Sequence, residues 1–182
     1  MENMLDRREC LFLIVDVQER LVSALDKDVV VKRTSTLAKA AKILEIPVVV
    51  TEQYPKGLGN TVELVKQNLP EETPILSKTA FSAVKEAGFM DTLKSFNKKQ
   101  IVISGIETHV CVHQTCADLL ALGYDVYIVK DACASRNKYE FKLGIERMQA
   151  NGAKISCVEI VIFEWLRSAQ NPHFKEVQAL IK

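Results

Sequence analysis

Cys111 stands out among the residues that could do chemistry because of its place in the sequence. Residues 101–112 run from a β-branched apolar stretch through Gly105 and a polar turn to this cysteine. The pattern predicts a buried strand, a turn and a helix with Cys111 near its start. A helix N-terminus carries about half a positive charge and unpaired N–H groups, which stabilise a thiolate and a developing oxyanion. Cys111 is therefore the candidate nucleophile.

Two further ionisable residues follow apolar stretches. Asp16 comes after the run Leu11–Val15, and Lys78 comes after residues 74–76. Taken singly, Asp16 fits a helix cap or turn and Lys78 fits a solvated surface position. In a parallel sheet, however, the carboxyl ends of strands share one edge, where ligands bind. If the first and fourth strands are neighbours there, Asp16 and Cys111 face each other as base and nucleophile.

The elements that must position these residues alternate between strand and helix patterns. We expect strands at 11–16, 47–51, 74–76, 100–104, 125–129 and 154–158. We expect helices at 29–44, 61–68, 86–96, 110–122, 138–150, 159–169 and 172–181. The alternation favours βαβ units, and the near-continuous apolar strands indicate burial on both faces of a parallel sheet. The predicted fold is α/β, with three α/β/α layers.

The composition favours one globular domain spanning residues 1–182. Hydrophobic residues make up 48% of the chain, and 24 Lys and Arg balance 23 Asp and Glu. A balanced charge argues against nucleic acid or an anionic membrane as partner. The N-terminus does not resemble a signal peptide, and no apolar run approaches the roughly 20 residues that span a bilayer. We expect a soluble, cytoplasmic protein.

Five cysteines, an odd number without a CxxC pair, argue against a disulfide framework. Cys116, Cys133 and Cys157 are expected in the core, whereas Cys10 could be buried or exposed.

The sequence resembles the isochorismatase-like superfamily of cysteine hydrolases along nearly its whole length. Four short segments carry the resemblance, and their order and spacing make it specific. They are Ile14-Val15-Asp16-Val17-Gln18, Ser77-Lys78-Thr79-Ala80-Phe81, and Gly105-Ile106-Glu107-Thr108-His109-Val110-Cys111-Val112 with Asp131-Ala132-Cys133-Ala134-Ser135-Arg136 after it. The loop at 51–59 looks like that of a less characterised branch of isochorismatase-domain proteins.

The resemblance implies an Asp-Lys-Cys triad of Asp16, Lys78 and Cys111 on a six-stranded sheet of order 3-2-1-4-5-6. It also implies a cis peptide between Ile106 and Glu107, at a cost of roughly 3 to 4 kcal/mol, that turns the Glu107 N–H toward that of Cys111 as an oxyanion hole. The activity implied is hydrolysis of a small amide, ester or vinyl ether through a covalent intermediate, most readily at the C–N bond of a non-peptide amide. Members of this superfamily usually assemble, so we expect a homo-oligomer.

Nicotinamidases of this superfamily hold a metal with an Asp-x-His pair and a further histidine. This chain has no histidine before His109, so we expect no metal and no cofactor. His109 and His113 are spaced i, i+4 and could share a helix face as metal ligands, but no third ligand is evident nearby.

The partner expected is a small-molecule substrate. The residues expected to bind it are Gln18, Gln53, Tyr54, Phe81, Thr108 and His109, with Glu107 beside them. Residues 52–60 either line the pocket or form a solvated connection. Two alternatives to the hydrolase stay open: a catalytically silent binding or scaffolding oligomer, and a redox-sensitive thiol protein. The apolar cluster Ile160, Ile162, Phe163 and Trp165 fits core packing or an interface.

Overall fold

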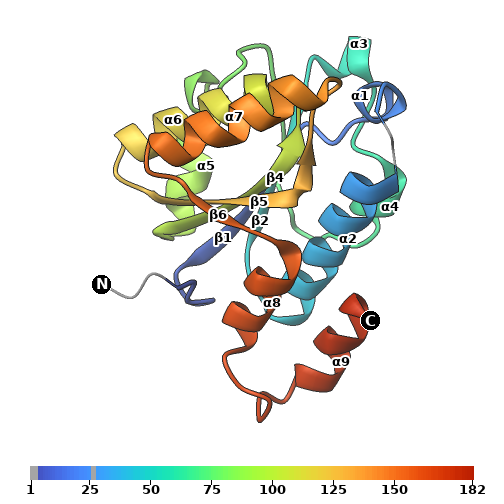
Figure 1. The fold of residues 1–182 in the computed structure, drawn as a ribbon, viewed down its shortest axis with the longest axis vertical. Coiled ribbons are helices and arrows are strands. Elements are labelled where there is room, and N and C mark those ends of the chain that lie inside the picture. Colours follow the sequence, from blue (N-terminus) through green and yellow to red (C-terminus); the bar gives the residue numbers. More distant parts are fainter. Residues whose placement is uncertain (1–3, 26–27) are drawn as a thin grey trace.

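A six-stranded parallel sheet forms the centre of the computed structural model, which describes residues 4–25 and 28–182 (Figure 1). The strand order is β3-β2-β1-β4-β5-β6, which confirms the order that the resemblance implied. The strands are β1 (Cys10–Val15), β2 (Val48–Gln53), β3 (Ile75–Lys78), β4 (Gln100–Ile106), β5 (Asp125–Ala134) and β6 (Lys154–Ser156). β1 pairs with both β2 and β4, so Asp16 and residues 107–111 leave neighbouring strands.

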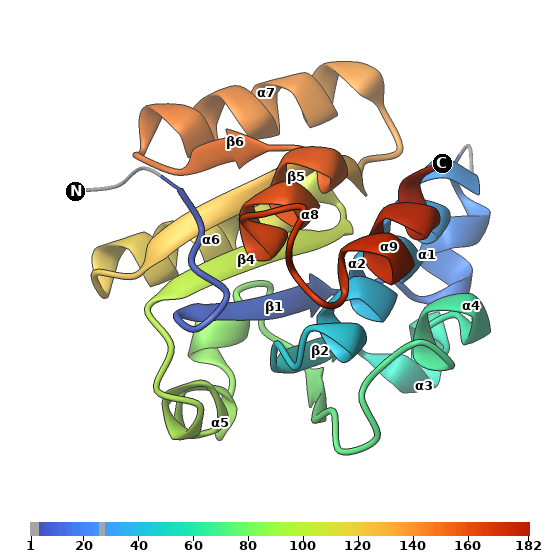
Figure 2. The same cartoon turned by 90° about the horizontal axis from the view of Figure 1, so that it is seen from below.

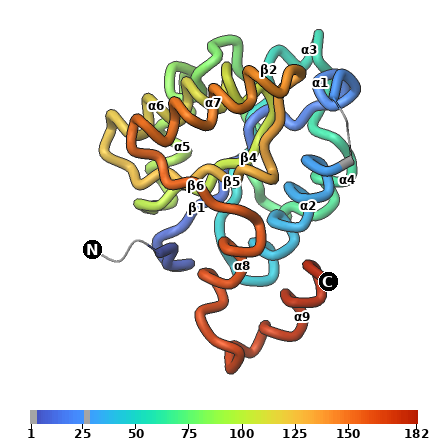
Figure 3. The backbone as a smooth tube through the Cα atoms, viewed as in Figure 1, coloured from blue at the N-terminus to red at the C-terminus, as the bar shows by residue number. Residues whose placement is uncertain are grey.

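Helices cover both faces of the sheet, giving the predicted three layers (Figures 1 and 2). One face carries α5 (Phe89–Ser95), α6 (His113–Ala121) and α7 (Lys138–Ala150). The other carries α2 (Asp28–Ile43) and α8 (Val158–Leu166), with α1 (Glu19–Ser23), α4 (Glu63–Lys66) and α9 (Phe174–Gln178) around them. The tube in Figure 3 shows the C-terminal segment returning along α8 toward α2.

β1 illustrates why the apolar runs are continuous. All six of its residues are buried. Phe12 and Ile14 belong to the core cluster on the α2 and α8 face, whereas Leu11, Leu13 and Val15 belong to the cluster on the opposite face. Successive side chains of a strand point to opposite faces, so a strand covered on both sides needs apolar residues throughout.

The observed elements differ from the predicted ones in several short segments and in β5, which continues to Ala134 instead of ending at Val129. α1 and α3 (Pro55–Leu58) were not predicted, because five and four residues are too few to show helical periodicity. The helix predicted at 86–96 begins only at Phe89, after Gly88 with φ of 81°. Short 3₁₀ turns lie at Ala83–Lys85 and Ala179–Ile181. α7 has its predicted bounds.

The apolar cluster of α8 divides between core and surface. Trp165 and Ile162 are buried, whereas Ile160 and Phe163 are 50% and 40% exposed. Within residues 4–25 and 28–182, no helix has both the length and the apolar character needed to cross a membrane.

Candidate active site

A buried ion pair joins Asp16 and Lys78 at the carboxyl edge of the sheet. Lys78 Nζ lies 2.8 Å from Asp16 Oδ2, and the two side chains are 1% and 0% exposed. Thr51 Oγ1 donates a 2.7 Å hydrogen bond to the other carboxylate oxygen, Oδ1. Apart from Lys78, no N–H or O–H group of the described residues donates a hydrogen bond to Oδ2. Burial makes the attraction within this pair stronger than at the surface and makes the pair costly to break.

Lys78 is held by three more acceptors. Its ammonium donates to Gln53 Oε1 at 2.5 Å and to the backbone carbonyls of Phe81 and Ala80 at 3.1 and 3.3 Å. An ammonium group has three protons to donate, so four nearby oxygens leave it fully occupied. The lysine is therefore a fixed charge and not the solvated surface residue that its segment alone allowed.

Cys111 is buried beside this pair, with only 5% of its surface exposed. The pKa of the Cys111 thiol is raised to about 12, chiefly by burial and then by Asp16, while Lys78 lowers it; both side chains act through charge and hydrogen bonding. A thiol with this pKa is protonated at neutral pH. A nucleophilic role would require a base, and the Asp16 carboxylate, which interacts with this thiol through charge and hydrogen bonding, is the candidate.

The turn that carries Cys111 is π-helical, spanning Thr108–Val112 ahead of α6. Wider turns of this kind are rare and recur at functional sites. Gly105 lets it approach β1: a Cβ there would lie 2.8 Å from Val15 Cβ and meet the Val15 carbonyl oxygen. Only glycine permits this close approach of β4, β1 and the turn that carries Cys111.

The cis peptide expected between Ile106 and Glu107 is not present: the described residues contain no cis peptide bond. The chain turns here through Glu107 itself, which adopts the left-handed conformation with φ of 59° and ψ of 61°. Asp16 does the same with φ of 56° at the end of β1. Left-handed φ in non-glycine residues is uncommon, so two such residues at adjacent strand ends mark a constrained site.

Glu107 forms a polar cluster that the sequence did not predict. Its Oε1 accepts a 2.9 Å hydrogen bond from Arg136 Nε, while Oε2 is buried without a hydrogen bond and lies 3.6 Å from His109 Nε2. His109 Nδ1 lies 3.0 Å from Ser135 Oγ. The segment 131–136 supports the resemblance, but only the strand register Ile106 to Ala134 explains why Arg136 reaches Glu107.

Gln18 and Gln53 lie inside the site but bind neighbouring protein groups. The Gln18 amide donates to the carbonyls of Gln53 and Gly59 at 3.0 and 2.7 Å and accepts from the Gln53 N–H at 2.7 Å. Gln53 holds Lys78 through Oε1 and donates to the Thr79 carbonyl at 2.9 Å. Both amides therefore connect the loops after β1, β2 and β3.

The chain matches the isochorismatase domain model over residues 10–160. It belongs to the isochorismatase family. The secreted isochorismatase effector Isc1 of Phytophthora sojae is 40% identical over 176 residues, which cover 94% of this chain and 84% of that protein. Among solved structures, MAR1 ribonuclease from Caenorhabditis elegans is 38% identical with a TM-score of 0.93, covering 98% of this chain and 92% of its own.

Two solved structures of YcaC also resemble this isochorismatase-family chain. YcaC from Pseudomonas aeruginosa, solved with hexane-2,5-diol and covalent acrylamide, is 27% identical with a TM-score of 0.93 and covers 99% of this chain and 92% of its own. YcaC from Escherichia coli, described as an octameric hydrolase of unknown specificity, is 25% identical with a TM-score of 0.89 and covers 100% and 96%. Family membership makes a hydrolase the coarse assignment for this chain.

Two cavities flank residues 79–82 of this isochorismatase-family site. Tyr54, 56% exposed, lines one of about 330 Å³ with Lys56, Lys78 and Glu86, among others. Phe81, 55% exposed, lines the other, of about 290 Å³, with His113. A larger cavity of about 570 Å³ lies against α8, lined by none of the candidate site residues. Lys78 lines the cavity beside Tyr54, whereas neither Cys111 nor Asp16 lines either of the two smaller cavities.

Thr108 and His113 are less exposed than Tyr54 and Phe81. Thr108 is fully buried and donates from Oγ1 to the Ala134 carbonyl at 2.9 Å. His113 Nε2 is buried without a partner, and burial and Arg147 lower the pKa of this imidazole. Among the described residues, no three His, Cys, Asp or Glu side chains are grouped as metal ligands.

Proposed function

We propose that this chain is a metal-independent cysteine hydrolase that cleaves the C–N bond of a small non-peptide amide. The observation that carries the proposal is the buried Asp16–Lys78 ion pair, whose two members shift the pKa of the Cys111 thiol in opposite directions. A buried ion pair is weak evidence for stability, because apolar residues of similar volume often serve the fold as well or better. A catalytic role accounts for it more directly.

In the proposed first step, the proton of the Cys111 thiol moves to an Asp16 oxygen as sulfur attacks the substrate carbonyl carbon. The carbonyl π electrons move to oxygen, and the N–H groups of Glu107 and Cys111 are proposed to bind the resulting oxyanion. Each such donor contributes on the order of 3 kcal/mol. For the Glu107 N–H, the proposed orientation comes from the left-handed backbone of Glu107 and not from a cis peptide bond.

The second step returns the proton. The C–N bond breaks, the amine leaves with the proton held by Asp16, and a thioester remains on Cys111. Water then attacks the thioester carbonyl while Asp16 takes one of its protons. The acid departs and the sulfur regains a proton. Lys78 stays charged throughout and stabilises Asp16 and the developing thiolate without changing its own proton count.

Substrate contact is proposed for Tyr54, Phe81 and His109, but not for the Thr108 side chain, which is fully buried and donates to the Ala134 carbonyl. Gln18 and Gln53 are proposed to act by positioning loops and Lys78. The cavity of about 330 Å³ beside Tyr54 lies at the lower end of the size range for ligand pockets, which supports a small substrate. The covalent acrylamide in the YcaC structure supports the same view, because acrylamide is a small amide with an electrophilic carbon.

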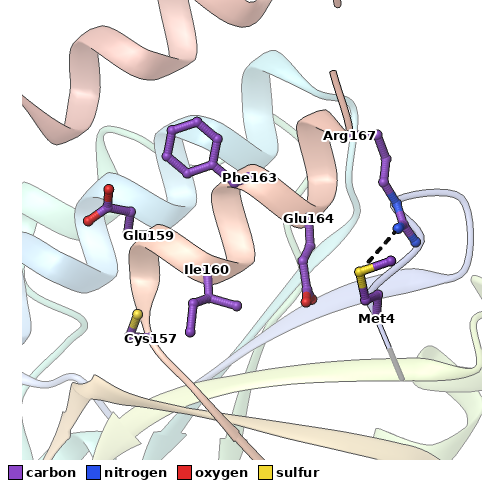
Figure 4. A pocket seen from close by; sticks show the side chains of 7 residues that line it. All are labelled: Met4, Cys157, Glu159, Ile160, Phe163, Glu164 and Arg167. Atoms are coloured by element: carbon purple, nitrogen blue, oxygen red, sulfur yellow. Dashed lines mark hydrogen bonds between the residues drawn. The ribbon is translucent and has the colours of Figure 1, made fainter. Parts of the chain in front are cut away.

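A homo-oligomer and a cytoplasmic location complete the proposal. Ile160 and Phe163 stay exposed on α8, beside a cavity of about 570 Å³ that Met4 and Arg167 also line (Figure 4). Figure 4 shows Ile160 and Glu164 projecting from the same side of α8 toward this space. The octameric state of Escherichia coli YcaC supports an oligomer, and a second copy of this chain would remove the apolar surface from water.

Two substitutions test the catalytic proposal against a panel of small amides. Cys111→Ala is expected to abolish turnover and leave the circular dichroism spectrum unchanged. Asp16→Asn is expected to lower turnover about 100-fold or more, the contribution of a general base, although it removes a charge that raises the Cys111 pKa. Turnover by Cys111→Ala at the wild-type rate would overturn the proposal.

A further inference from the structure

Two hydrogen bonds attach the loop after β3 to helix α6. Ser82 Oγ donates to Asp118 Oδ2 at 2.7 Å, and the Ala83 N–H donates to Thr115 Oγ1 at 3.0 Å. Thr115 is fully buried, and Ser82 is 3% exposed. Connecting loops normally run over the surface, whereas this one is held by two buried or partly buried hydrogen bonds to side chains of α6. We call residues 79–83 the Lys78 loop.

The Lys78 loop supplies two of the four oxygens around the lysine. The carbonyls of Ala80 and Phe81 accept from Lys78 Nζ, and these residues directly precede Ser82 and Ala83. The attachment to α6 is therefore one or two peptide units away from the acceptors. Movement of the loop away from α6 would carry these carbonyls, and with them the ammonium, away from its place.

α6 also continues the turn that carries the nucleophile. Thr115 lies four residues after Cys111 and Asp118 three residues after Thr115, the spacing of side chains on one helix face. The same helical segment thus holds the thiol and the loop that holds the ammonium. Burial and Asp16 raise the pKa of the Cys111 thiol, and Lys78 lowers it. Moving the ammonium away would therefore raise this pKa further.

We propose that Thr115 and Asp118 are positioning residues, which hold the Lys78 ammonium against Cys111 by anchoring the Lys78 loop to α6. The proposal rests on the proposed function, in which Lys78 acts on the Cys111 thiol. Neither residue is assigned a contact with substrate. Their hydroxyl and carboxylate act through Ala83 and Ser82.

The test measures the rate at which iodoacetamide alkylates Cys111 at pH 8, followed by peptide mapping so that the other cysteines do not interfere. Thr115→Val and Asp118→Ala remove the two acceptors. Each is expected to slow alkylation about fivefold or more, within the range of coupling seen between contacting groups. Thr115→Ser and Asp118→Asn keep an acceptor oxygen and are expected to restore the wild-type rate.

A double-mutant cycle separates positioning of Lys78 from a change in access to the thiol. In a Lys78→Met background, Thr115→Val is expected to change the rate less than about twofold, because the group it positions is gone. Should Lys78→Met fail to fold, the Lys78→Met/Asp16→Asn background removes both charges and leaves no unpaired carboxylate. Leu119→Ala, a core substitution in α6, controls for general loss of stability and is expected to keep the wild-type rate.

An unchanged or increased rate in Thr115→Val, or the same slowing with and without Lys78, would overturn the positioning proposal. Those results leave the proposed function intact. The proposed function fails separately if Lys78→Met alone alkylates at the wild-type rate, since Lys78 then has no influence on the thiol.

Discussion

The ammonium of Lys78 and the carboxylate of Asp16 lie 2.8 Å apart with almost no surface exposed. The pair joins the ends of β3 and β1, which are separated in the sheet by β2. Thr51 and Gln53 of β2 complete it by binding one partner each. Three adjacent strands thus contribute to one buried ion pair. Removing either charge of the pair leaves the other buried and unpaired.

Removing the positive charge alone should therefore be far more damaging than removing both charges. Lys78→Met is expected to lower the free energy of unfolding by about 3 to 5 kcal/mol, because Asp16 is left as an uncompensated buried anion. The Lys78→Met/Asp16→Asn double variant is expected to recover most of this loss while remaining inactive. Urea denaturation of the three proteins measures the difference, and equal stability of the single and double variants would contradict it.

Gly105 should not tolerate a side chain. Gly105→Ala places a Cβ against Val15 and 3.0 Å from Val112 Cγ2, in fully buried surroundings. Overpacking of this kind typically costs about 1 to 3 kcal/mol, and here the backbone must shift beneath the turn that carries Cys111. We expect lower thermal stability together with slower Cys111 alkylation.

Gly57→Ala is the matched control for that substitution. Its added Cβ meets only the ring of Tyr54, an exposed side chain that can rotate away. It is expected to leave the melting temperature close to the wild-type value. Equal losses in the two variants would show that the close approach at Gly105 is not special.

Alkaline pH should destabilise the protein through its buried thiols. Burial raises the pKa of Cys10, Cys111, Cys116 and Cys133 from 9.0 to about 12. A thiol that keeps its proton better in the folded chain stabilises it fully below pH 9. This contribution is lost as pH rises from 9 toward 12, at up to about 1.4 kcal/mol per pH unit for each thiol.

Replacing one of these thiols should make the free energy of unfolding fall less steeply as pH rises. Cys116→Ala is expected to lose less unfolding free energy than the wild type between pH 9 and pH 11, as measured by urea denaturation at each pH. Leu119→Ala opens a cavity in the same helix without removing a titrating group, so its stability should stay below that of the wild type by a constant amount. Parallel curves for Cys116→Ala and the wild type would argue against the buried-thiol account.

The exposed face of α8 should determine the assembly state. Light scattering after size-exclusion chromatography is expected to give a multiple of the 20.4 kDa chain mass. Ile160→Glu adds a charge to an apolar surface that already carries Glu159 and Glu164, so it should shift the protein to smaller species. Tyr139→Glu, on an exposed position of α7, is the control and should keep the wild-type mass.

The fold was largely predictable because burial in a parallel sheet leaves a local signal. The six apolar segments around residues 11–16, 47–51, 74–76, 100–104, 125–129 and 154–158 each contain or overlap an observed strand. Residue types at the strand ends likewise singled out Asp16, Lys78 and Cys111. The strand order and their grouping as a triad came from the resemblance, since periodicity does not say which strands are neighbours.

By itself, the sequence determined which residues are buried on both faces of the sheet and which ionisable residues end its strands. Those properties depend on side-chain type and on spacing of two or three to four residues, both of which are local. Only the tertiary structure decided what those ionisable residues touch: Gln53 and two loop carbonyls on Lys78, Arg136 on Glu107, and left-handed φ where a cis bond was expected. Such contacts depend on strand register and on loops anchored by distant helices, so no local pattern records them.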